Sequence, residues 1–317
     1  MFGMPKTKSI VFIAWKRLSR RTELLSEALG AKLLFFQGNF LYLSATIATI
    51  KKIAKIKPHA VLVQLPQGPL LLLTLILKNF YGFRLIADVH TGFLMKWEWK
   101  SLLLNLPFKS LLKYCDVVVI HNEKMRNLLH DSANKKAMIV YDPWFMIKPL
   151  PQNFKEKYIV FPASYHPDEP LEEVLGAVKE LSPDVKLLVT GDWRRRSYLK
   201  KFESKNILFT GFLSKEKFES LIANSSGIIT GTKEEFTTLM SAWEAVAYTK
   251  PLAVNVTQTI RECYDSYPVF YDWKDKKSIT KAIQDVLSSS PKEFSRKNLM
   301  RMTIKSVNNI IEYINTL

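Results

Sequence analysis

The sequence has few cysteines, few glycines and no long apolar run. Its 317 residues include two cysteines and 11 glycines. Two cysteines without metal-site spacing make no disulfide framework, which excludes a secreted disulfide scaffold and indicates a reducing compartment. The longest apolar run, Leu70–Leu77, is far shorter than the ~20 residues that a membrane-spanning helix needs. Met1–Ser9 leads into a short apolar stretch and then basic residues, which is not a signal-peptide pattern. The sequence predicts no spanning helix and remains compatible with a protein that rests on a membrane surface.

Acidic residues are scarce in the first half of the chain. Residues 1–150 hold 22 Lys and Arg against 8 Asp and Glu, a net charge of +14, whereas residues 151–317 carry a net charge of +3. This asymmetry favours an anionic partner for the first half, such as phospholipid headgroups, a pyrophosphate-linked acceptor or nucleic acid. No recognised nucleic-acid motif accompanies the charge, so we do not expect nucleic acid. The alternative is an ordinary basic surface of a soluble protein.

Short apolar runs typical of strands alternate with helix-like stretches, and the alternation restarts after a proline-rich segment at 142–157. Continuous apolar strands separated by helices predict parallel sheets covered on both faces. We therefore expect an α/β fold of two tandem Rossmann-like, doubly wound domains, covering residues 1–150 and 151–317. The expected strands are Ser9–Ala14, Lys32–Phe36, Ala60–Gln64, Arg84–Asp88, Asp116–Ile120, Lys136–Tyr141, Tyr158–Ala163, Val185–Thr190, Ile207–Thr210, Gly227–Thr230 and Leu252–Asn255. The expected helices are Ser19–Leu29, Leu41–Ile56, Pro69–Phe80, Leu102–Tyr114, Glu169–Leu181, Arg196–Phe202, Lys215–Ala223, Thr238–Tyr248 and Phe294–Leu317.

Several short motifs stand at the ends of these strands or lead into the helices that follow them. They are Asp88–Gly92, Val117–Glu123, Tyr165–Pro170, Thr190–Asp192, Gly211–Leu213, Leu239–Ala247 and Lys250–Val254. In this order they resemble the group 1 glycosyltransferases of GT-B architecture, and the strand-end motifs also resemble the β-mannosyltransferases that extend lipid-linked chitobiose. The resemblance implies a first domain that binds the acceptor, a second that binds a nucleotide-sugar, and a cleft between them. It also implies that the last helix crosses back onto the first domain, although simple packing explains that helix equally well.

The sequence departs from the family pattern in two places. The family commonly has a Glu-x7-Glu pair, but if Glu244 is its second member, Phe236 stands at the first position, just after Glu234 and Glu235. The Arg and Lys often found after the first strand of the second domain are absent from Phe161–Leu175. The family's usual grip on the donor therefore cannot be carried over unchanged.

The predicted donor site must stabilise the negative charge of a departing diphosphate. Helix N-termini and cationic side chains supply this without a metal. We expect Thr237 and Thr238 in the first turn of a helix to receive the diphosphate, although Thr238 would also suit a simple N-cap. By resemblance, Glu244 holds the ribose hydroxyls. The other predicted donor-binding residues are Gly191, Arg194, Arg195, Glu235 and His166.

No DxD motif stands in a metal-binding context, so we expect no metal ligands and no cofactor, the nucleotide-sugar being a co-substrate. His90 and Asp88 are the predicted catalytic residues, because both stand at the end of one strand. A histidine there can hydrogen-bond the donor sugar or act on the acceptor hydroxyl, and Asp88 is the alternative base. A structural hydrogen-bonded histidine is the plainer interpretation.

The loop after the first strand carries four basic residues, Lys16, Arg17, Arg20 and Arg21, and lacks the glycines of a dinucleotide fingerprint. It is predicted to bind a phosphate-bearing acceptor. Residues 93–109 interleave aromatics, leucines and lysines, which suits the headgroup level of a membrane or an ordinary amphipathic helix.

The sequence thus predicts a metal-independent hexosyl-type transferase that moves a sugar from a nucleotide-sugar to a lipid-linked or membrane-proximal glycan acceptor. Its basic first half would contact a membrane, and its expected location is cytoplasmic, peripheral on the cytoplasmic face. The alternatives are a non-catalytic GT-B subunit that binds a glycan or an anion beside a transferase, and a sugar-nucleotide epimerase of the same architecture.

Overall fold

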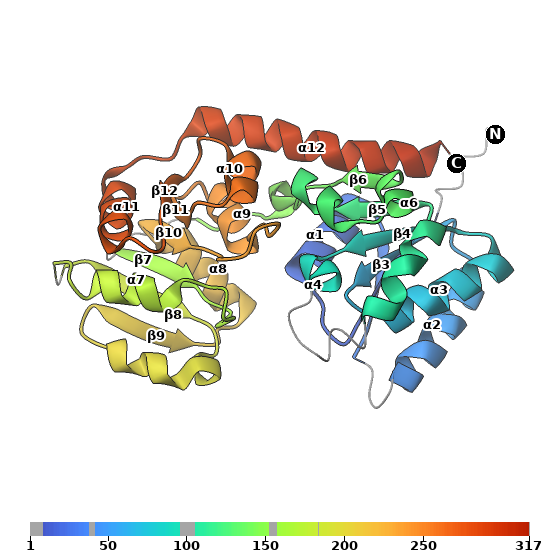
Figure 1. The fold of residues 1–317 in the computed structure, drawn as a ribbon, viewed down its shortest axis with the longest axis horizontal. Coiled ribbons are helices and arrows are strands. Elements are labelled where there is room, and N and C mark those ends of the chain that lie inside the picture. The colour runs from blue at the N-terminus through green and yellow to red at the C-terminus, as the bar shows by residue number, and fades with distance from the viewer. Residues whose placement is uncertain (1–8, 38–41, 96–104, 152–156, 183, 317) are drawn as a thin grey trace. The chain divides into compact units, whose positions relative to one another are not determined.

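The computed structural model describes residues 9–37, 42–95, 105–151, 157–182 and 184–316. The chain forms two compact units, each an α/β structure around its own sheet (Figure 1). The first unit comprises Met1–Met146 together with Thr303–Leu317, and the second comprises Ile147–Met302. The second unit is therefore continuous in sequence, whereas the first takes its last residues from the end of the chain.

The first unit is built on a six-stranded sheet in the order β2-β1-β3-β4-β5-β6, in which all neighbours are parallel. Its strands are β1 (Ile10–Trp15), β2 (Lys32–Phe36), β3 (Ala60–Leu65), β4 (Arg84–Val89), β5 (Val117–Ile120) and β6 (Ala137–Ile139). Its α-helices are α1 (Arg20–Ala28), α2 (Leu43–Ile56), α3 (Gly68–Tyr81), α4 (Thr91–Leu94) and α6 (Asp131–Asn134). The described residues also form the 3-10 helices η2 (Ser110–Tyr114), η3 (Glu123–Leu128) and η4 (Trp144–Met146).

The second unit has a parallel sheet in the order β12-β11-β10-β7-β8-β9. Its strands are β7 (Tyr158–Pro162), β8 (Lys186–Thr190), β9 (Ile207–Gly211), β10 (Gly227–Thr230), β11 (Leu252–Asn255) and β12 (Val269–Tyr271). Its helices are α7 (Leu171–Val178), η5 (Trp193–Phe202), α8 (Lys215–Asn224), α9 (Met240–Ala247), α10 (Gln258–Tyr264) and α11 (Lys276–Ser288). The strand order reverses between β7 and β10, which is the kind of switch point where open α/β sheets bind ligands.

The central strands form because their side chains are apolar on both faces. All six residues of β3 and all four of β5 are buried, as expected for parallel strands covered by helices on both sides. Helix α1 begins where Ser19 accepts a hydrogen bond from the amide of Thr22, a side-chain N-cap. Each unit has its own core, centred on Phe12 and Leu62 in the first and on Phe161 and Leu175 in the second.

The last helix, α12 (Glu293–Asn315), belongs to both units. Near its start, Arg296 donates to the carbonyl of Val246 in the second unit. Near its end, Val307, Ile310 and Ile314 are buried in the core of the first unit. The second part of α12 packs on the first unit because its apolar face is buried in that unit's core.

Some predicted elements differ from the observed ones. Residues 105–109 of the predicted helix 102–114 are helical and lead into the 3-10 helix η2, while residues 102–104 lie outside the described residues. The predicted helix 196–202 is the 3-10 helix η5, which Asp192 caps and which is kinked at Arg196. Helix α9 begins at Met240 rather than Thr238. The sequence analysis made no prediction for α10, β12 and α11, although the spacing of Ile279, Ala282, Ile283 and Val286 on α11 is that of an amphipathic helix. Within the described parts of the chain, no helix is long and apolar enough to span a membrane.

Candidate functional site

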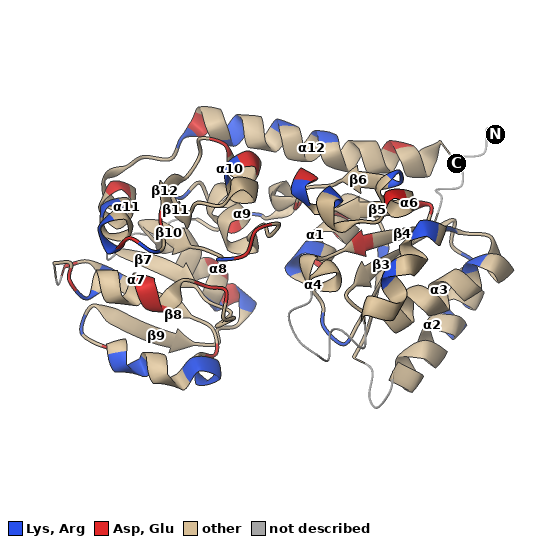
Figure 2. Cartoon of the chain, viewed as in Figure 1, with Lys and Arg blue, Asp and Glu red and all other residues tan. Residues whose placement is uncertain are grey.

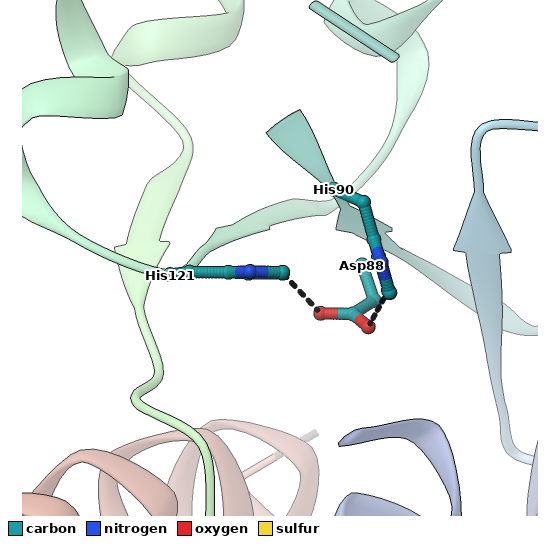
Figure 3. Close-up of side chains that lie close together, drawn as sticks. All are labelled: Asp88, His90 and His121. Atoms are coloured by element: carbon teal, nitrogen blue, oxygen red, sulfur yellow. Dashed lines mark hydrogen bonds and ion pairs between the residues drawn. The ribbon is translucent and has the colours of Figure 1, made fainter. Parts of the chain in front are cut away.

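The first unit gathers ionisable side chains at the carboxyl ends of its central strands. Asp88 lies near the end of β4, His90 follows that strand, and His121 follows β5. Nε2 of His90 lies 3.3 Å from Oδ2 of Asp88, and Nε2 of His121 lies 3.7 Å from Oδ1 (Figure 3). The two imidazole rings meet edge to face with 4.9 Å between their centroids. Parallel strands that end at the same edge of the sheet bring these residues together.

Arg21 completes this cluster from helix α1. Its Nε and Nη2 donate to Oδ1 of Asp88 at 3.1 and 3.0 Å, and its Nη1 donates to Oδ1 of Asp142 at 3.0 Å. The Arg21 side chain is only 4% exposed and that of Asp88 is fully buried. The prediction that Arg21 contacts the acceptor does not fit this placement, because its guanidinium is held inside the unit by two carboxylates.

Burial and charge fix the protonation states here. Burial alone would raise the pKa of Asp88, but the Arg21 cation, the neighbouring His121 ring and the hydrogen bond with His90 hold it well below its ordinary value. Burial, helped by the charge of Arg21, lowers the pKa of His121 to about 4. Asp88 is therefore a carboxylate and His121 a neutral imidazole near pH 7. A carboxylate with so low a pKa is a poor general base, so Asp88 does not suit that predicted role.

The same three side chains could in principle hold a metal ion. Asp88, His90 and His121 each offer one ligand atom, and these atoms lie within 4.8 Å of one another. Arg21 already donates two hydrogen bonds to Asp88, and its positive charge opposes a divalent cation at the same carboxylate. The arrangement suits a hydrogen-bonded cluster better than a metal centre.

His90 remains the predicted catalytic residue that the geometry suits. Its side chain is partly exposed, whereas Asp88 beside it is buried. Because Asp88 is a carboxylate, it favours the tautomer in which Nε2 of His90 carries the proton. That tautomer leaves Nδ1 unprotonated and able to accept a proton.

In the second unit, two loops meet at the switch point between β7 and β10. The backbone amide of Lys233, after β10, donates to the carbonyl of Asp168, after β7, at 2.7 Å. The amide of Thr232 donates to Oδ1 of the buried Asn255, also at 2.7 Å. Hydrogen bonds therefore fix both loops at the place where this fold class holds ligands.

The Glu169 carboxylate is hydrogen-bonded to backbone amides of the loop after β7. Its carboxylate accepts from the amides of Ser164 and Tyr165, each at 2.8 Å, and from the Ser164 hydroxyl at 2.7 Å. Burial raises the pKa of Glu169, against the opposing effect of these hydrogen bonds. Consecutive amides of this kind form an anion-binding concavity, which here holds a carboxylate of the same chain. The sequence analysis placed Glu169 at the start of a predicted helix and did not assign it to the site.

Gly191 and the arginines after it lie beside this loop. A Cβ on Gly191 would stand 2.0 Å from the carbonyl oxygen of Ala163, and its φ of +92° is one that side chains rarely adopt. Nη1 of Arg195 donates to the carbonyl of Ser164 at 3.2 Å. Both arginines are exposed, and Arg194 pairs with Asp192 at 2.7 Å. Gly191 and Arg195 thus adjoin the switch-point loop, and Arg194 stands nearby on the same turn.

The remaining predicted donor residues are placed less simply. Glu235 accepts hydrogen bonds from the amides of Gln258 and Thr259 in the first turn of α10. Thr237 and Thr238 precede α9 instead of opening it, so neither supplies a first-turn amide or an N-cap; Leu239 stands at that position. Glu244 is half-buried within α9. His166 is exposed and is bonded to Asp168.

Three of the four predicted acceptor-binding residues lie at the surface. Lys16 and Arg17 are exposed after β1, and Arg20 is partly exposed and pairs with Glu23 at 3.3 Å. Gln64, which was not predicted, positions this loop: it accepts from the Ser19 amide and donates to the Arg17 carbonyl. A polar residue in an otherwise apolar strand was the signal for it. Asp142 gave no such signal, because it stands in a proline-rich stretch.

These features define a class of protein. Two Rossmann-like units, each with a parallel six-stranded sheet, form the GT-B architecture of glycosyltransferases. A family model, glycosyl transferases group 1, matches residues 142–303, just over half of the chain. The chain belongs to this family, and the matched segment covers the second unit. The resemblance to chitobiose β-mannosyltransferases stays a prediction.

Solved structures agree with the fold. HepE of Anabaena, in complex with UDP and glucose, is similar with 10% sequence identity and a TM-score of 0.72, covering 98% of this chain and all of that one. Sucrose-phosphate synthase of Thermosynechococcus elongatus gives 12% identity and a TM-score of 0.70, covering 97% of this chain and 96% of that one. UDP-GlcNAc 2-epimerase of Methanocaldococcus jannaschii gives 13% identity and a TM-score of 0.59, covering 93% and 99%. Comparison with curated proteins gave no match.

Replacement of Arg21 by Ala should strongly destabilise the protein, because it leaves Asp88 charged and buried without its main partner. We expect a loss of ~3–5 kcal/mol in the free energy of unfolding, measured by urea denaturation. Arg20→Ala, which removes a surface ion pair, is the control and should cost under about 1 kcal/mol. Equal losses in the two variants would contradict the assigned role of Arg21.

The buried His121 should make stability depend on pH. Its pKa is about 4 in the folded chain against 6.5 unfolded, so the unfolded chain binds the extra proton first as the pH falls. His121 therefore leaves the free energy of unfolding unchanged above pH 6.5, and lowers it progressively as the pH falls from 6.5 to about 4. The total decrease is up to ~3 kcal/mol. His121→Gln should flatten this part of the denaturation profile, whereas replacement of the exposed His130 should leave it. An unchanged slope in His121→Gln would refute the assignment.

Gly191→Ala tests the tight approach of two strand-end loops. In Gly191→Ala the added Cβ meets the Ala163 carbonyl, and the backbone φ is positive. In Gly211→Ala the φ is also positive, but no atom lies within 4 Å of the added Cβ. Gly211→Ala should cost about 1–2 kcal/mol for its backbone conformation, and Gly191→Ala clearly more. Thermal denaturation of the two variants measures the difference, and matching melting temperatures would show that the contact with Ala163 is unimportant.

Proposed function

We propose that this group 1 glycosyltransferase moves a hexosyl group from a nucleotide-sugar to a lipid-linked or membrane-proximal glycan acceptor at the cytoplasmic face of a membrane. The second unit would bind the donor and the first unit the acceptor. Family membership over residues 142–303 supports the transfer reaction. The similarity of fold to HepE, a protein solved with UDP and glucose, supports a nucleotide-sugar as donor.

One observation carries the placement of the donor. In the second unit, the switch point between β7 and β10 lies beside the Gly191 turn, and Arg195 reaches from that turn to the carbonyl of Ser164. Arginine suits the paired oxygens of a diphosphate. We assign Arg195, with Arg194 on the same turn, to the charge that develops on the departing diphosphate, a task that needs no metal ion.

His90 is assigned to the acceptor side of the reaction. Asp88 holds Nε2 of His90, so Nδ1 is the atom that would take the proton from the attacking acceptor hydroxyl. As that hydroxyl oxygen bonds to the anomeric carbon, the bond from this carbon to the diphosphate breaks and the diphosphate leaves with the electron pair. The Asp88 carboxylate would stabilise the imidazolium that forms, and Arg21 keeps Asp88 ionised.

A non-catalytic subunit of the same fold is the second candidate, and one observation favours it. The Glu169 carboxylate accepts hydrogen bonds from the Ser164 and Tyr165 amides. The same segment lacks the basic residues common in the family. A sugar-nucleotide epimerase shares the fold, but the family match favours a transferase. A glycan-binding subunit would bind acceptor without hydrolysing or transferring any donor.

Nucleotide binding provides the test. Thermal shift and donor hydrolysis are measured across UDP-, GDP- and dTDP-sugars, with and without EDTA. One nucleotide class should raise the melting temperature, and EDTA should not change the shift. Arg195→Ala should weaken that nucleotide's affinity by ~10–100-fold, the worth of one charged hydrogen bond. Glu244→Gln should weaken it as well if Glu244 holds the ribose.

The control is Arg301→Ala, which removes an exposed arginine of α12. It should leave nucleotide affinity unchanged. A protein that no nucleotide stabilises would not be a transferase, and the non-catalytic candidate would stand in its place. Loss of the shift on adding EDTA would refute metal independence.

A further inference from the structure

Helices α2 and α3 present apolar side chains to the surface of the first unit. On α2 the exposed apolar residues are Leu43, Ile47 and Ile50, and on α3 they are Leu72, Ile76 and Phe80. Ile47 is 53% exposed and Phe80 is 79% exposed. Spacings of three and four residues put each set on one side of its helix. Two apolar stripes of this kind are more than the scattered single residues that a soluble surface normally carries.

The two stripes belong to one face of the unit. The crossovers β2→β3 and β3→β4 run in the same direction along the sheet, and such crossovers are right-handed, so α2 and α3 cover the same side of the sheet. The helices also contact each other and lie side by side in Figure 1. The six residues Leu43, Ile47, Ile50, Leu72, Ile76 and Phe80 are called the α2–α3 face below.

The charged residues of these two helices are all basic, and one of them, Lys78 of α3, is paired with Asp116 at 2.7 Å. Helix α2 carries Lys51, Lys52 and Lys55, all exposed, and α3 carries Lys78; neither helix contains an acidic residue. Figure 2 shows blue and no red on these helices. Lys51 and Lys55 continue the row that starts with Leu43 and Ile47, so the apolar part of α2 leads directly into a cationic part.

The same combination continues past α3. Lys78 donates to the carbonyl of Tyr114 at the end of η2, which joins α3 to the next segment of the face. A cavity of about 560 Å³ lies there, lined by Leu106, Leu112, Leu128 and Leu129 with Lys109 and Lys113, and by no acidic residue. Apolar and cationic side chains are thus neighbours on α2, on α3 and around this cavity.

We propose that the α2–α3 face docks onto a lipid bilayer that contains anionic phospholipids. The apolar side chains enter the boundary between headgroups and acyl chains, and Lys51, Lys52 and Lys55 contact the phosphates. A second copy of the chain is a poorer occupant, because its lysines and its net charge of +17 would repel an identical face. The sequence had pointed to residues 93–109, of which 96–104 lie outside the described residues.

This inference deepens the proposed function, since a membrane-proximal acceptor requires the enzyme to reach a bilayer, but its test is separate. Flotation of the full chain is measured with vesicles of phosphatidylcholine alone and of phosphatidylcholine mixed with phosphatidylglycerol. The protein should bind the anionic vesicles and bind neutral ones far more weakly. Lys51→Gln, Lys52→Gln and Lys55→Gln together should weaken binding by ~100-fold, at roughly fivefold for each lysine near an anionic surface.

The apolar contribution is tested with Ile47→Ser and Phe80→Ser together, which should weaken vesicle binding by at least ~10-fold. The matched control is Phe212→Ser with Phe294→Ser, two phenylalanines of the second unit that are equally or more exposed. Lys205, Lys215 and Lys217 changed to Gln, also exposed in the second unit, are the control for charge. Both controls should bind vesicles as the unchanged protein does.

Three results would overturn the proposal. These are no binding to anionic vesicles, equal losses in the variants and their controls, and sedimentation of a dimer that Ile47→Ser with Phe80→Ser converts to a monomer. The nucleotide-induced thermal shift of each variant separates the two proposals. A normal shift without vesicle binding refutes only the docking face, whereas vesicle binding without any nucleotide shift refutes only the transferase.

Discussion

The ion pairs of Arg21 are the interaction on which the first unit depends. One guanidinium joins the start of α1, the end of β4 and the segment after β6, through Asp88, Asp142 and the carbonyl of Val140. A buried carboxylate is tolerable only with such a partner, since burial without one is strongly unfavourable. The partner also keeps Asp88 ionised, which orients His90. Stability of the sheet edge and orientation of the candidate base therefore rest on the same cation.

In the second unit, the chain's own carboxylates occupy backbone amides that could otherwise face an anion. The Glu169 carboxylate accepts hydrogen bonds from the Ser164 and Tyr165 amides, and the Glu235 carboxylate accepts one from the Thr259 amide in the first turn of α10. Each carboxylate stiffens a strand-end loop and also adds negative charge near it. A bound diphosphate would then depend more on side chains such as Arg195 than on free amides. Under the proposed function, Arg194 and Arg195 would take the place of the basic residues that the family commonly has after the first strand of its second domain.

The fold was largely predictable from sequence because buried parallel strands are continuous apolar runs; β2, β10 and β11 have the predicted bounds. The meeting of Asp88 and His90 was predictable from strand ends. The role of Arg21 was not, because it depends on Asp142, which follows 121 residues later and becomes a neighbour only when the sheet forms. The start of α9 was also mistaken, since Thr238 has the chemistry of a cap whereas tertiary contacts of Leu239 with Tyr264 decide the boundary.

Because α12 contributes residues to both units, it sets the order in which the two units can fold during synthesis. The core of the first unit includes Val307, Ile310 and Ile314, so this unit lacks some of its core until residues 303–317, which are made after the second unit, leave the ribosome. The second unit is continuous in sequence and can be complete earlier. The amino-terminal unit is therefore the last to be finished, which reverses the usual order in which domains mature along a nascent chain.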